Sequence, residues 1–576
     1  MTAPYCPTGQ QKTVIIHDGS AFVTACPGAG KTRTLVERAR HLADRTDDKR
    51  GVAFLSFTNA AVDELQSRLG LFGLLTSPLF PSFIGTFDRF LWQFFIAPFG
   101  IPGCTVLPQL VVDKNNWEVK PPFAKAHALT LECFDRKTGA IDAARAGEHG
   151  FDTTERNPAA WETCARRIIQ SARANGLVDF DDVRSCVAER LGDTNFAERV
   201  GKALAARFRE IVVDEAQDCN PSDLSVVHWL RRSGLSVKVI CDPQQSIFKF
   251  RGGITNELLD FAATFDPSER LVMNGNFRST AAICSAIVAL RPPSARVDKD
   301  EAIGKHKDDA TPIHLLSYSG NGVSTAIGAK FADLVRSLDI TIGHAPLLAS
   351  TLSSASKAIG QPTLGKTNEK SLLLAQAVMS YHFSFTSGGR REALASLHRI
   401  ILFIQGHIGT MGDYHAHLAE SGMIDGRWRP DVIAVANELR YEPGETPSQW
   451  LAKARLSVEA DMVRGLNVNQ RLRSHANLAT ALAAAPVDAP PPRTIHSAKG
   501  LEFPAVCVVM TSQKAGRILD YLEGDTTNGA DEDARKIYVA ASRAERLLVM
   551  AIPKNTAGRM QALLTSVGCA VEINKI

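Results

Sequence analysis

The hydrophobic residues of this chain fall into short uninterrupted runs, and longer helix-like stretches separate these runs. Short apolar runs rich in β-branched residues are typical of strands that are buried on both faces. The predicted strands are Ala21–Thr24, Val52–Phe57, Ile211–Val213, Val237–Ile240, Val506–Met510 and Leu547–Ala551. Strands that alternate with helices in this way favour an α/β fold, in which helices cover both faces of parallel sheets.

Two long stretches interrupt this alternation with amphipathic helical patterns. The predicted helices are Trp161–Ala174 and Phe180–Leu191 in the first stretch, and Lys370–Met379, Arg391–Phe403, Gln449–Leu466 and Asn477–Ala485 in the second. The proline-rich segment Pro486–Arg493 predicts a stiff linker into the strand that follows. A chain of 576 residues is too long for one core and fits several domains.

A glycine-rich turn joins the first predicted strand to a helical pattern that begins at Arg33. Glycines in such a turn let backbone N–H groups approach phosphate oxygens with no Cβ in the way, and the helix N-terminus adds partial positive charge. Lys31 is suited to reach the terminal phosphates of a nucleotide, and the hydroxyl of Thr32 is suited to hold Mg²⁺. The residues of this predicted phosphate-binding loop (P-loop) are Ala25, Cys26, Pro27, Gly28, Ala29, Gly30, Lys31 and Thr32. Because Ala25 replaces the glycine of the strict motif, an ordinary turn with an incidental lysine is the alternative.

Two acidic residues follow the predicted strand Ile211–Val213. Asp214 is suited to hold Mg²⁺, and Glu215 to orient and deprotonate an attacking water. An acidic pair at a strand end also commonly caps the next helix, so this signal is weak alone. Together with the P-loop, it predicts binding and hydrolysis of a nucleoside triphosphate.

Further motifs follow in order along the chain. They are FTNAAVDEL (Phe57–Leu65), GTFDRF (Gly85–Phe90), DEAQD (Asp214–Asp218), CDPQQSIFKFRG (Cys241–Gly252), NFRST (Asn276–Thr280), TIHSAKGLEF (Thr494–Phe503) and EDARKIYVAASRA (Glu532–Ala544). This series resembles motifs Ia to VI of the UvrD/Rep/PcrA-type superfamily 1A DNA helicases. Two positions depart from the family pattern, because Ala60 replaces a lysine and Asp88 replaces a histidine.

The resemblance implies two RecA-like P-loop NTPase domains, each interrupted by a mainly helical insertion, with ATP and Mg²⁺ held between them. We expect domain 1A at residues 1–96 and 191–270, an inserted domain 1B at 97–190, domain 2A at 271–360 and 490–576, and a reduced 2B-like insertion at 361–489.

The resemblance also implies a set of nucleotide-binding residues outside the P-loop. Gln11 resembles the glutamine that reads the adenine edge, with Gln10 as the alternative. Phe277 stands where an aromatic ring stacks on adenine. Arg33 and Glu502 resemble residues beside the sugar.

Three further residues resemble the family's catalytic groups. Gln245 stands where the γ-phosphate is sensed, and Arg278 and Arg543 resemble the two arginine fingers. Two cations aimed at the γ-phosphate suit the negative charge of phosphoryl transfer. Ordinary surface salt bridges are the alternative for both arginines.

The residues expected to contact single-stranded DNA are Phe57, Thr58, Asn59, Thr86, Phe87, Phe248, Phe250 and His496. In the family, aromatic residues at such positions stack on bases, which contributes about 1–3 kcal/mol per base without reading sequence. The polar residues are suited to bond phosphates or sugars. Burial in the core is the alternative for the phenylalanines, above all for Phe57.

Composition mainly excludes certain kinds of site and of protein. The net charge of +4 neither favours nor excludes nucleic acid, since the distribution of charge decides that. The 11 cysteines form no CxxC pair and predict reduced thiols without a zinc or iron–sulfur site. We see no membrane span and no signal peptide, and expect a cytoplasmic protein.

The resemblance leaves two functions open. The first is an ATP-dependent DNA helicase that moves 3′ to 5′ on single strands or tailed duplexes, in DNA repair or antiphage defence. The second is a nucleic-acid-activated ATPase subunit that activates a partner nuclease without unwinding by itself. A narrower resemblance to the helicase-like B subunit of the Gabija antiphage system, which works with an OLD-family nuclease, supports the second. The chain ends soon after Ala544, so we expect any nuclease to be a separate chain.

The 2B-like insertion at 361–489 contains two basic clusters. Each cluster either contacts duplex DNA or a partner, or forms a solvated helix face. The first cluster contains Arg390, Arg391, His398 and Arg399, and the second contains Lys453, Arg455, Arg464, Arg471 and Arg473.

Overall fold

The computed structural model describes residues 6–45, 47–75, 79–111, 114–123, 126–154, 156–247, 255–297, 299–320, 322–361, 367–387, 390–423, 426–483 and 489–576. Their contacts divide the chain into two compact units, and each is described by itself below. Unit 1 contains the described residues of Met1–Thr24, Thr32–Cys241 and Phe250–Leu271. Unit 2 contains those of Ala25–Lys31, Asp242–Lys249 and Val272–Ile576.

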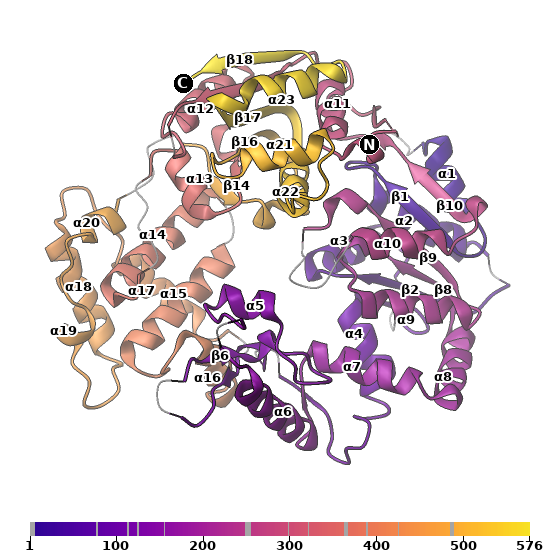
Figure 1. The fold of residues 1–576 in the computed structure, drawn as a ribbon, viewed down its shortest axis with the longest axis horizontal. Helices are drawn as coiled ribbons and strands as arrows, with labels where there is room; N and C mark the ends of the chain where they lie inside the picture. Colours follow the sequence, from indigo (N-terminus) through magenta and orange to yellow (C-terminus); the bar gives the residue numbers. More distant parts are fainter. Residues whose placement is uncertain are drawn as a thin grey trace. The chain divides into compact units, whose positions relative to one another are not determined.

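Unit 1 is built on a six-stranded sheet with the order β10-β1-β9-β8-β2-β3 (Figure 1). The pairings β1–β9, β8–β9, β2–β8 and β2–β3 are parallel. The strands are almost wholly buried, which explains why the sequence shows continuous apolar runs rather than alternation. The elements around this sheet are α1 (Gly9–Ile16), β1 (Ala21–Ala25), α2 (Lys31–Ala43), β2 (Gly51–Ser56), α3 (Asn59–Leu71), β3 (Phe83–Thr86), α4 (Phe87–Leu91), α8 (Thr194–Arg207), β8 (Phe208–Val213), α9 (Pro221–Arg232), β9 (Ser236–Cys241), α10 (Thr255–Ala263) and β10 (Arg270–Met273).

The region between α4 and α8 mixes helices with short strands. Its elements are β4 (Gln109–Leu110), β5 (Glu118–Val119), β6 (Leu129–Thr130), α5 (Ala143–Glu148), α6 (Ala159–Ala174), β7 (Leu177–Val178) and α7 (Phe180–Leu191). The residue pair Asp179 and Asp182 forms a capping box at the start of α7, so this helix begins and ends as the sequence predicts. Phe151 and Trp161 pack edge to face in a small separate core.

Unit 2 contains a second six-stranded sheet, with the order β15-β14-β16-β17-β13-β18 and parallel pairing throughout. The two six-stranded parallel sheets confirm the predicted α/β class. The elements of this part are β11 (Gly275–Asn276), α11 (Ala281–Ala289), β12 (Glu301–Ala302), β13 (Ile313–Tyr318), α12 (Ile327–Ser337), β14 (Leu347–Ala349), α13 (Leu352–Ala358), β15 (Pro492–Thr494), β16 (Phe503–Val509), α21 (Ala515–Glu523), α22 (Asp531–Ala541), β17 (Ala544–Pro553), α23 (Lys554–Ser566) and β18 (Val571–Lys575).

The insertion in unit 2 is a group of helices with a core of its own (Figure 1). Trp450 lies at its centre, fully buried, and its indole N–H donates to the carbonyl oxygen of Leu439 at 2.7 Å. Helix α14 runs further than the sequence pattern predicts, whereas α18 ends earlier. The helices are α14 (Lys370–Ser387), α15 (Arg390–Gln405), α16 (Tyr414–Glu420), α17 (Arg429–Glu438), α18 (Pro447–Glu459), α19 (Val468–Arg471) and α20 (Leu478–Ala481).

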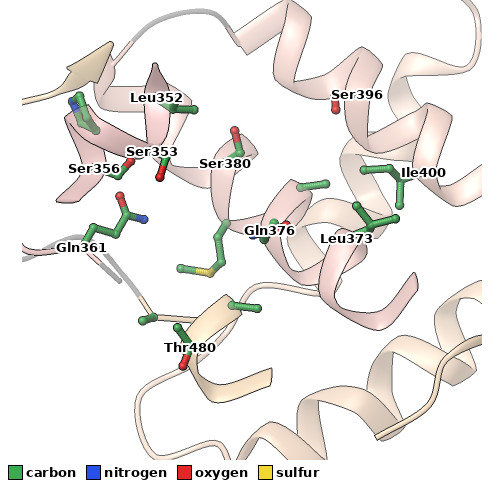
Figure 2. A pocket seen from close by; sticks show the side chains of 15 residues that line it. Leu352, Ser353, Ser356, Gln361, Leu373, Gln376, Ser380, Ser396, Ile400 and Thr480 are labelled. Atoms are coloured by element: carbon green, nitrogen blue, oxygen red, sulfur yellow. The ribbon is translucent and has the colours of Figure 1, made fainter. Parts of the chain in front are cut away.

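A cavity of about 400 Å³ lies where the insertion meets α13 (Figure 2). Ser353 and Ser356 reach it from α13, Gln376 from α14 and Thr480 from α20. None of the described residues that line it is charged. The junction between the insertion and the sheet is therefore packed less completely than the core around Trp450.

The basic clusters of the insertion form an exposed face only in part, because Arg390, Arg464 and Arg473 are exposed and the other described members are buried or half-buried. His398 is buried, stacks on Trp428 with ring centroids 4.1 Å apart, and shares a 3.0 Å hydrogen bond with the hydroxyl of Tyr414. Half-buried Arg399 lies over the same tyrosine ring. The side chain of Arg391 lies outside the described part of the structure.

Some side chains of the second cluster also bond groups within the insertion. Arg455 donates to the carbonyl oxygen of Leu472 at 2.8 and 3.0 Å, and Arg471 donates to that of Phe403. Lys453 donates to the carbonyl oxygen of Arg440 at 2.9 Å. These three half-buried cations bond carbonyl oxygens of neighbouring segments, and contact of either cluster with duplex DNA or a partner stays a prediction.

Candidate nucleotide and DNA sites

The P-loop follows β1 and ends where α2 begins, which is the strand–turn–helix setting that the motif needs. Gly28 and Gly30 both have positive φ, at 71° and 74°. A Cβ on Gly28 would lie 2.5 Å from Oδ1 of Asn276 and 2.8 Å from Cβ of Arg278, so only glycine fits here. Phe277 donates its backbone N–H to the carbonyl oxygen of Gly28 at 2.9 Å. The predicted adenine-stacking residue is thus tied directly to the loop.

The first residues of this loop are more deeply buried than its last two. Ala25, Cys26, Pro27 and Ala29 are buried, whereas Lys31 and Thr32 are half-buried at the start of α2. Burial raises the pKa of the Cys26 thiol well above its usual range, which keeps it neutral. All 11 cysteines are free, as the sequence predicts.

The predicted catalytic acids follow β8 in unit 1. The backbone N–H of Asp214 extends the sheet by donating to Leu55 at 2.8 Å, and its Oδ1 accepts from the backbone N–H of Glu215 at 2.9 Å. Glu215 has a left-handed backbone, with φ 54° and ψ 39°, and its carboxylate accepts from the side chain of Gln217. This conformation costs a non-glycine residue about 1–3 kcal/mol and is concentrated at functional sites. No sequence pattern indicates this conformation.

The two predicted arginine fingers in unit 2 are each held by another predicted site residue. Arg543 is buried and donates to Oε1 of Gln245 at 2.7 Å. Arg278 forms an ion pair with Glu502 and donates to the carbonyl oxygen of Ser542 at 2.8 Å. Residues from four distant motifs therefore meet in two pairs.

Two residues that the sequence analysis missed orient Gln245. Its side-chain amide donates to Oδ2 of Asp242 at 2.9 Å, and the same oxygen accepts from the hydroxyl of Tyr538 at 3.1 Å. Tyr538 is fully buried, and its burial raises the pKa of its hydroxyl well above the usual range. Both residues lie inside the matched motifs, so the motif letters could have indicated them.

The candidate adenine-reading residues lie on α1. Thr8 and Gln11 form a capping box in which Oε1 of Gln11 accepts from the backbone N–H of Thr8 at 3.0 Å. Gln11 is only 1% exposed, whereas Gln10 is half-buried. Arg33 pairs with Glu37 at 3.1 Å on the helix that follows the P-loop.

Comparison with known proteins identifies the chain. The family model described as the UvrD/REP helicase N-terminal domain matches residues 7–96 and 106–266, and that of the UvrD-like helicase C-terminal domain matches residues 491–555. The chain belongs to the UvrD/Rep helicase family. It is an ATP-dependent DNA helicase.

Three relatives of this UvrD/Rep-type helicase have low sequence identity to it, and two of them align over almost its whole length. YjcD of Bacillus subtilis is 23% identical over 96% of this chain and 79% of its own length. The ATP-dependent DNA helicase PcrA of Staphylococcus epidermidis is 22% identical over 97% of this chain and 85% of its own length. The ATP-dependent DNA helicase UvrD1 of Mycobacterium leprae is 26% identical over 48% of this chain and 38% of its own length.

Three of the five candidate DNA residues of unit 1, Phe57, Thr86 and Phe87, line one cavity of about 400 Å³. Half-buried Phe57 stacks on Phe87 with ring centroids 5.4 Å apart. Phe87 has no exposed surface, so it supports Phe57 rather than offering its own face to a base. Thr58 and Thr86 accept hydrogen bonds from backbone N–H groups at the starts of α3 and α4, and Asn59 is exposed.

Asp88, which replaces a family histidine, also lines this cavity. Its carboxylate lies 2.7 Å from the guanidinium of Arg184, which also pairs with Asp223 at 2.8 Å. One cation between two carboxylates leaves this part of the cavity negatively charged, and that disfavours a phosphate beside Asp88.

The remaining predicted DNA residues belong to unit 2 or are not described. His496 shares a 3.3 Å hydrogen bond with the carbonyl oxygen of Ile247, and burial lowers its pKa. It is therefore a neutral hydrogen-bonding group at neutral pH. Phe248 and Phe250 lie outside the described residues. No described helix is long and apolar enough to cross a membrane.

Proposed function

We propose that this helicase moves 3′ to 5′ along single-stranded DNA, powered by ATP hydrolysis at the P-loop and the acids after β8. Family membership supports the ATP-dependent DNA helicase activity. The observation that carries the site assignment is the meeting of motif residues in unit 2, where Arg543 bonds Gln245 and Arg278 pairs with Glu502. Chance spacing would not bring these residue types together.

The residues of the site suit the expected chemistry. The hydroxyl of Thr32 and the carboxylate of Asp214 are the hard oxygen donors that Mg²⁺ prefers, and Mg²⁺ would neutralise phosphate charge when bound. No described cluster of three or more His, Cys, Asp or Glu side chains could hold a metal by itself, so phosphate and water would complete the set. Glu215 would orient and deprotonate the attacking water.

The arginine pairs suggest how ATP binding is sensed. Arg278 and Arg543 now bond protein acceptors, and a bound γ-phosphate would compete for the same guanidinium groups. Gln245 would thereby report the nucleotide state to Asp242 and Tyr538, which share its hydrogen-bond network. Gln11, or Gln10 beside it, would read the adenine edge.

The deciding experiment measures steady-state ATP hydrolysis by the purified chain with and without a single-stranded oligonucleotide. We expect stimulation at low salt that weakens as salt rises, because phosphate contacts release counterions. An equal rate with and without DNA at low salt would refute a translocating motor.

The second candidate is a DNA-activated ATPase that switches on a partner nuclease, as the Gabija-like resemblance suggests. The ion pairs of Asp88 and Arg184 favour it, because they make the unit 1 cavity a poor phosphate site. A strand-displacement assay separates the two functions. Hydrolysis without displacement of any tailed duplex supports the second, and phage challenge of cells with and without the gene tests the antiphage role.

A further inference from the structure

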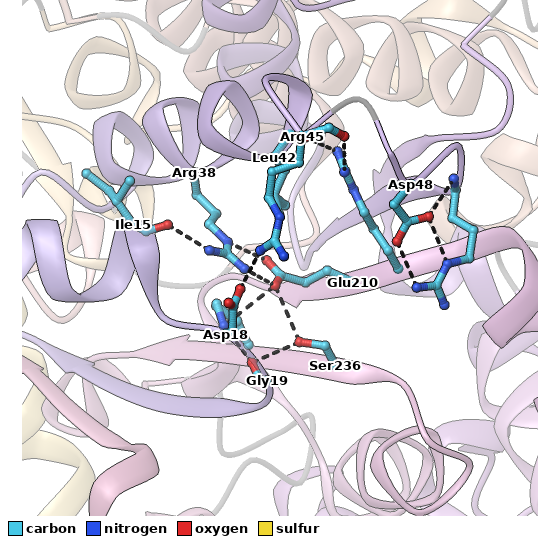
Figure 3. Close-up of polar contacts among 12 residues, drawn as sticks. Ile15, Asp18, Gly19, Arg38, Leu42, Arg45, Asp48, Glu210 and Ser236 are labelled. Carbon is cyan, nitrogen blue, oxygen red and sulfur yellow. Dashed lines mark hydrogen bonds and ion pairs between the residues drawn. The ribbon is translucent and has the colours of Figure 1, made fainter.

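A group of buried charged residues lies in unit 1 and includes none of the predicted phosphate or DNA contacts (Figure 3). Arg38 on α2, Glu210 on β8 and Lys238 on β9 are each no more than 2% exposed. Burying charges costs several kcal/mol per ion unless hydrogen bonds compensate, and apolar residues of similar size often serve stability as well or better. Stability alone does not explain why these charges are present.

The guanidinium of Arg38 serves two acceptors at once. It donates from Nε and Nη2 to the two carboxylate oxygens of Glu210, at 3.0 and 2.6 Å, and from Nη1 to the carbonyl oxygen of Ile15, at 2.7 Å. Ile15 lies in the last turn of α1, where helix carbonyl groups lack partners within the helix. A cation at this end also interacts favourably with the helix dipole.

Lys238 contacts the segment that connects α1 to β1, four residues after Ile15. Its ammonium donates to the carbonyl oxygen of Gly19 at 2.6 Å and lies 3.5 Å from Oε2 of Glu210. The hydroxyl of Ser236 donates to the same carbonyl oxygen at 2.8 Å. The last turn of α1 is thus held at Ile15, and the segment that follows it at Gly19, by two cations that share one carboxylate (Figure 3).

The elements joined here are those that carry the proposed nucleotide contacts. Helix α1 carries Gln10 and Gln11, α2 begins at Lys31, and β8 leads into Asp214. Gln11 lies one helical turn before Ile15 on the same short helix. Any shift of the Ile15 carbonyl therefore moves the adenine-reading residues relative to the P-loop helix.

We propose that Arg38, Glu210 and Lys238 are positioning residues that fix α1 against α2 and so set the enzyme's preference for the adenine base. The inference rests on the proposed function, in which α1 reads adenine and α2 carries the phosphate contacts. Fixing the connecting segment pre-orients the glutamines before nucleotide binds, and this raises affinity for ATP without touching the phosphates.

The test compares ATP with GTP in the full chain, using DNA-stimulated hydrolysis. For Arg38→Met we expect KM for ATP to rise about 10-fold, kcat to change less than about twofold, and the ratio of kcat/KM for ATP over GTP to fall about 10-fold. Arg38→Lys keeps a cation beside Glu210 but cannot serve both acceptors in the same geometry, so a smaller change of the same kind is expected. This variant carries the test if Arg38→Met fails to fold.

An apolar triple variant separates positioning from stability. Arg38→Met, Glu210→Leu and Lys238→Met together should restore the melting temperature, since no charge stays buried, but not the preference for ATP, since Ile15 still lacks its donor. The matched control is Arg45→Met, which breaks the exposed ion pair with Asp18 of the same segment and should leave the melting temperature and the preference for ATP unchanged.

Two results would overturn the inference. One is a lower melting temperature for Arg38→Met with an unchanged ATP-to-GTP ratio, and the other is recovery of that ratio in the apolar triple variant. Lys31→Ala keeps the two proposals apart. If Lys31→Ala is inactive while the Arg38 variants keep wild-type selectivity, only the positioning role fails, whereas turnover by Lys31→Ala would refute the site assignment itself.

Discussion

The cationic side chains of unit 2 have different bonding partners in the motif region and in the insertion. In the motif region, Arg278 and Arg543 meet Glu502 and Gln245, which come from other motifs. In the insertion, Arg455 and Arg471 bond backbone carbonyl groups between helices. The motif cations therefore bond residues of other motifs, whereas several of the clustered cations bond the backbone of the insertion itself.

Histidine shows the same contrast. His496 lies in the motif TIHSAKGLEF (Thr494–Phe503) at a half-buried position and bonds the carbonyl oxygen of Ile247. His398 is sealed between Trp428 and Tyr414, and burial lowers its pKa to about 4. The first is accessible for function, whereas the second is a core residue, so we now expect any partner surface of the insertion to avoid the His398 face.

The contrast between the motif region and the insertion fails if the motif region does not hydrolyse ATP. Lys31→Ala removes the only cation of the P-loop and should lower ATP hydrolysis by about 10²–10³-fold or more. The melting temperature should stay near that of the wild type, because Lys31 is half-buried rather than part of the core. Steady-state turnover and thermal unfolding of the same preparation check both statements, and near-normal turnover would remove the basis for the site.

Glu215→Gln tests the acid after β8. Hydrolysis should fall by about 10²–10⁴-fold, because the amide cannot accept the proton of the attacking water. Binding of ATP, measured by isothermal calorimetry, should persist, because the proposed role of Glu215 is to act on the attacking water and not to bind phosphate. Loss of binding together with hydrolysis would instead assign Glu215 a structural role in holding the left-handed turn.

Phe57→Ala tests the DNA side of the motor. If Phe57 supports a base, its removal should weaken single-strand binding by about 1–3 kcal/mol while hydrolysis without DNA is unchanged. Fluorescence anisotropy with a labelled oligonucleotide measures this. Its stacking on Phe87 makes some loss of stability certain, so normal binding with a lowered melting temperature would show that Phe57 is only a core residue.

The smallest effect concerns the insertion. Since the folded-state pKa of His398 is lowered to about 4 from an ordinary value of 6.5, the unfolded chain binds the proton more readily between these values. Stability should therefore fall as pH drops from about 6.5 towards 4. His398→Phe should remove this part of the pH dependence, and thermal unfolding across the range shows it. An identical pH profile in both proteins would contradict the burial account.

Sequence patterns located the six predicted strands to within a few residues, because strands buried on both faces leave apolar runs. They missed β3, β10, β14, β15 and β18, which are short or partly exposed, and β13, whose His314 and Ser317 interrupt its apolar residues. The motifs identified residues such as Gln245 but not its bond to Arg543, nor the left-handed backbone of Glu215. Such features depend on contacts between distant segments, and so local patterns do not contain them.

The most direct test of the proposed motor follows translocation on single-stranded DNA that carries a fluorophore at one end. With ATP present, we predict an arrival signal at a 5′-end label, with a lag that lengthens in proportion to oligonucleotide length. The same strands labelled at the 3′ end should show no length-dependent lag. A lag that appears only with the 3′ label, or no lag at either end while DNA-stimulated hydrolysis continues, would contradict a 3′ to 5′ translocating motor.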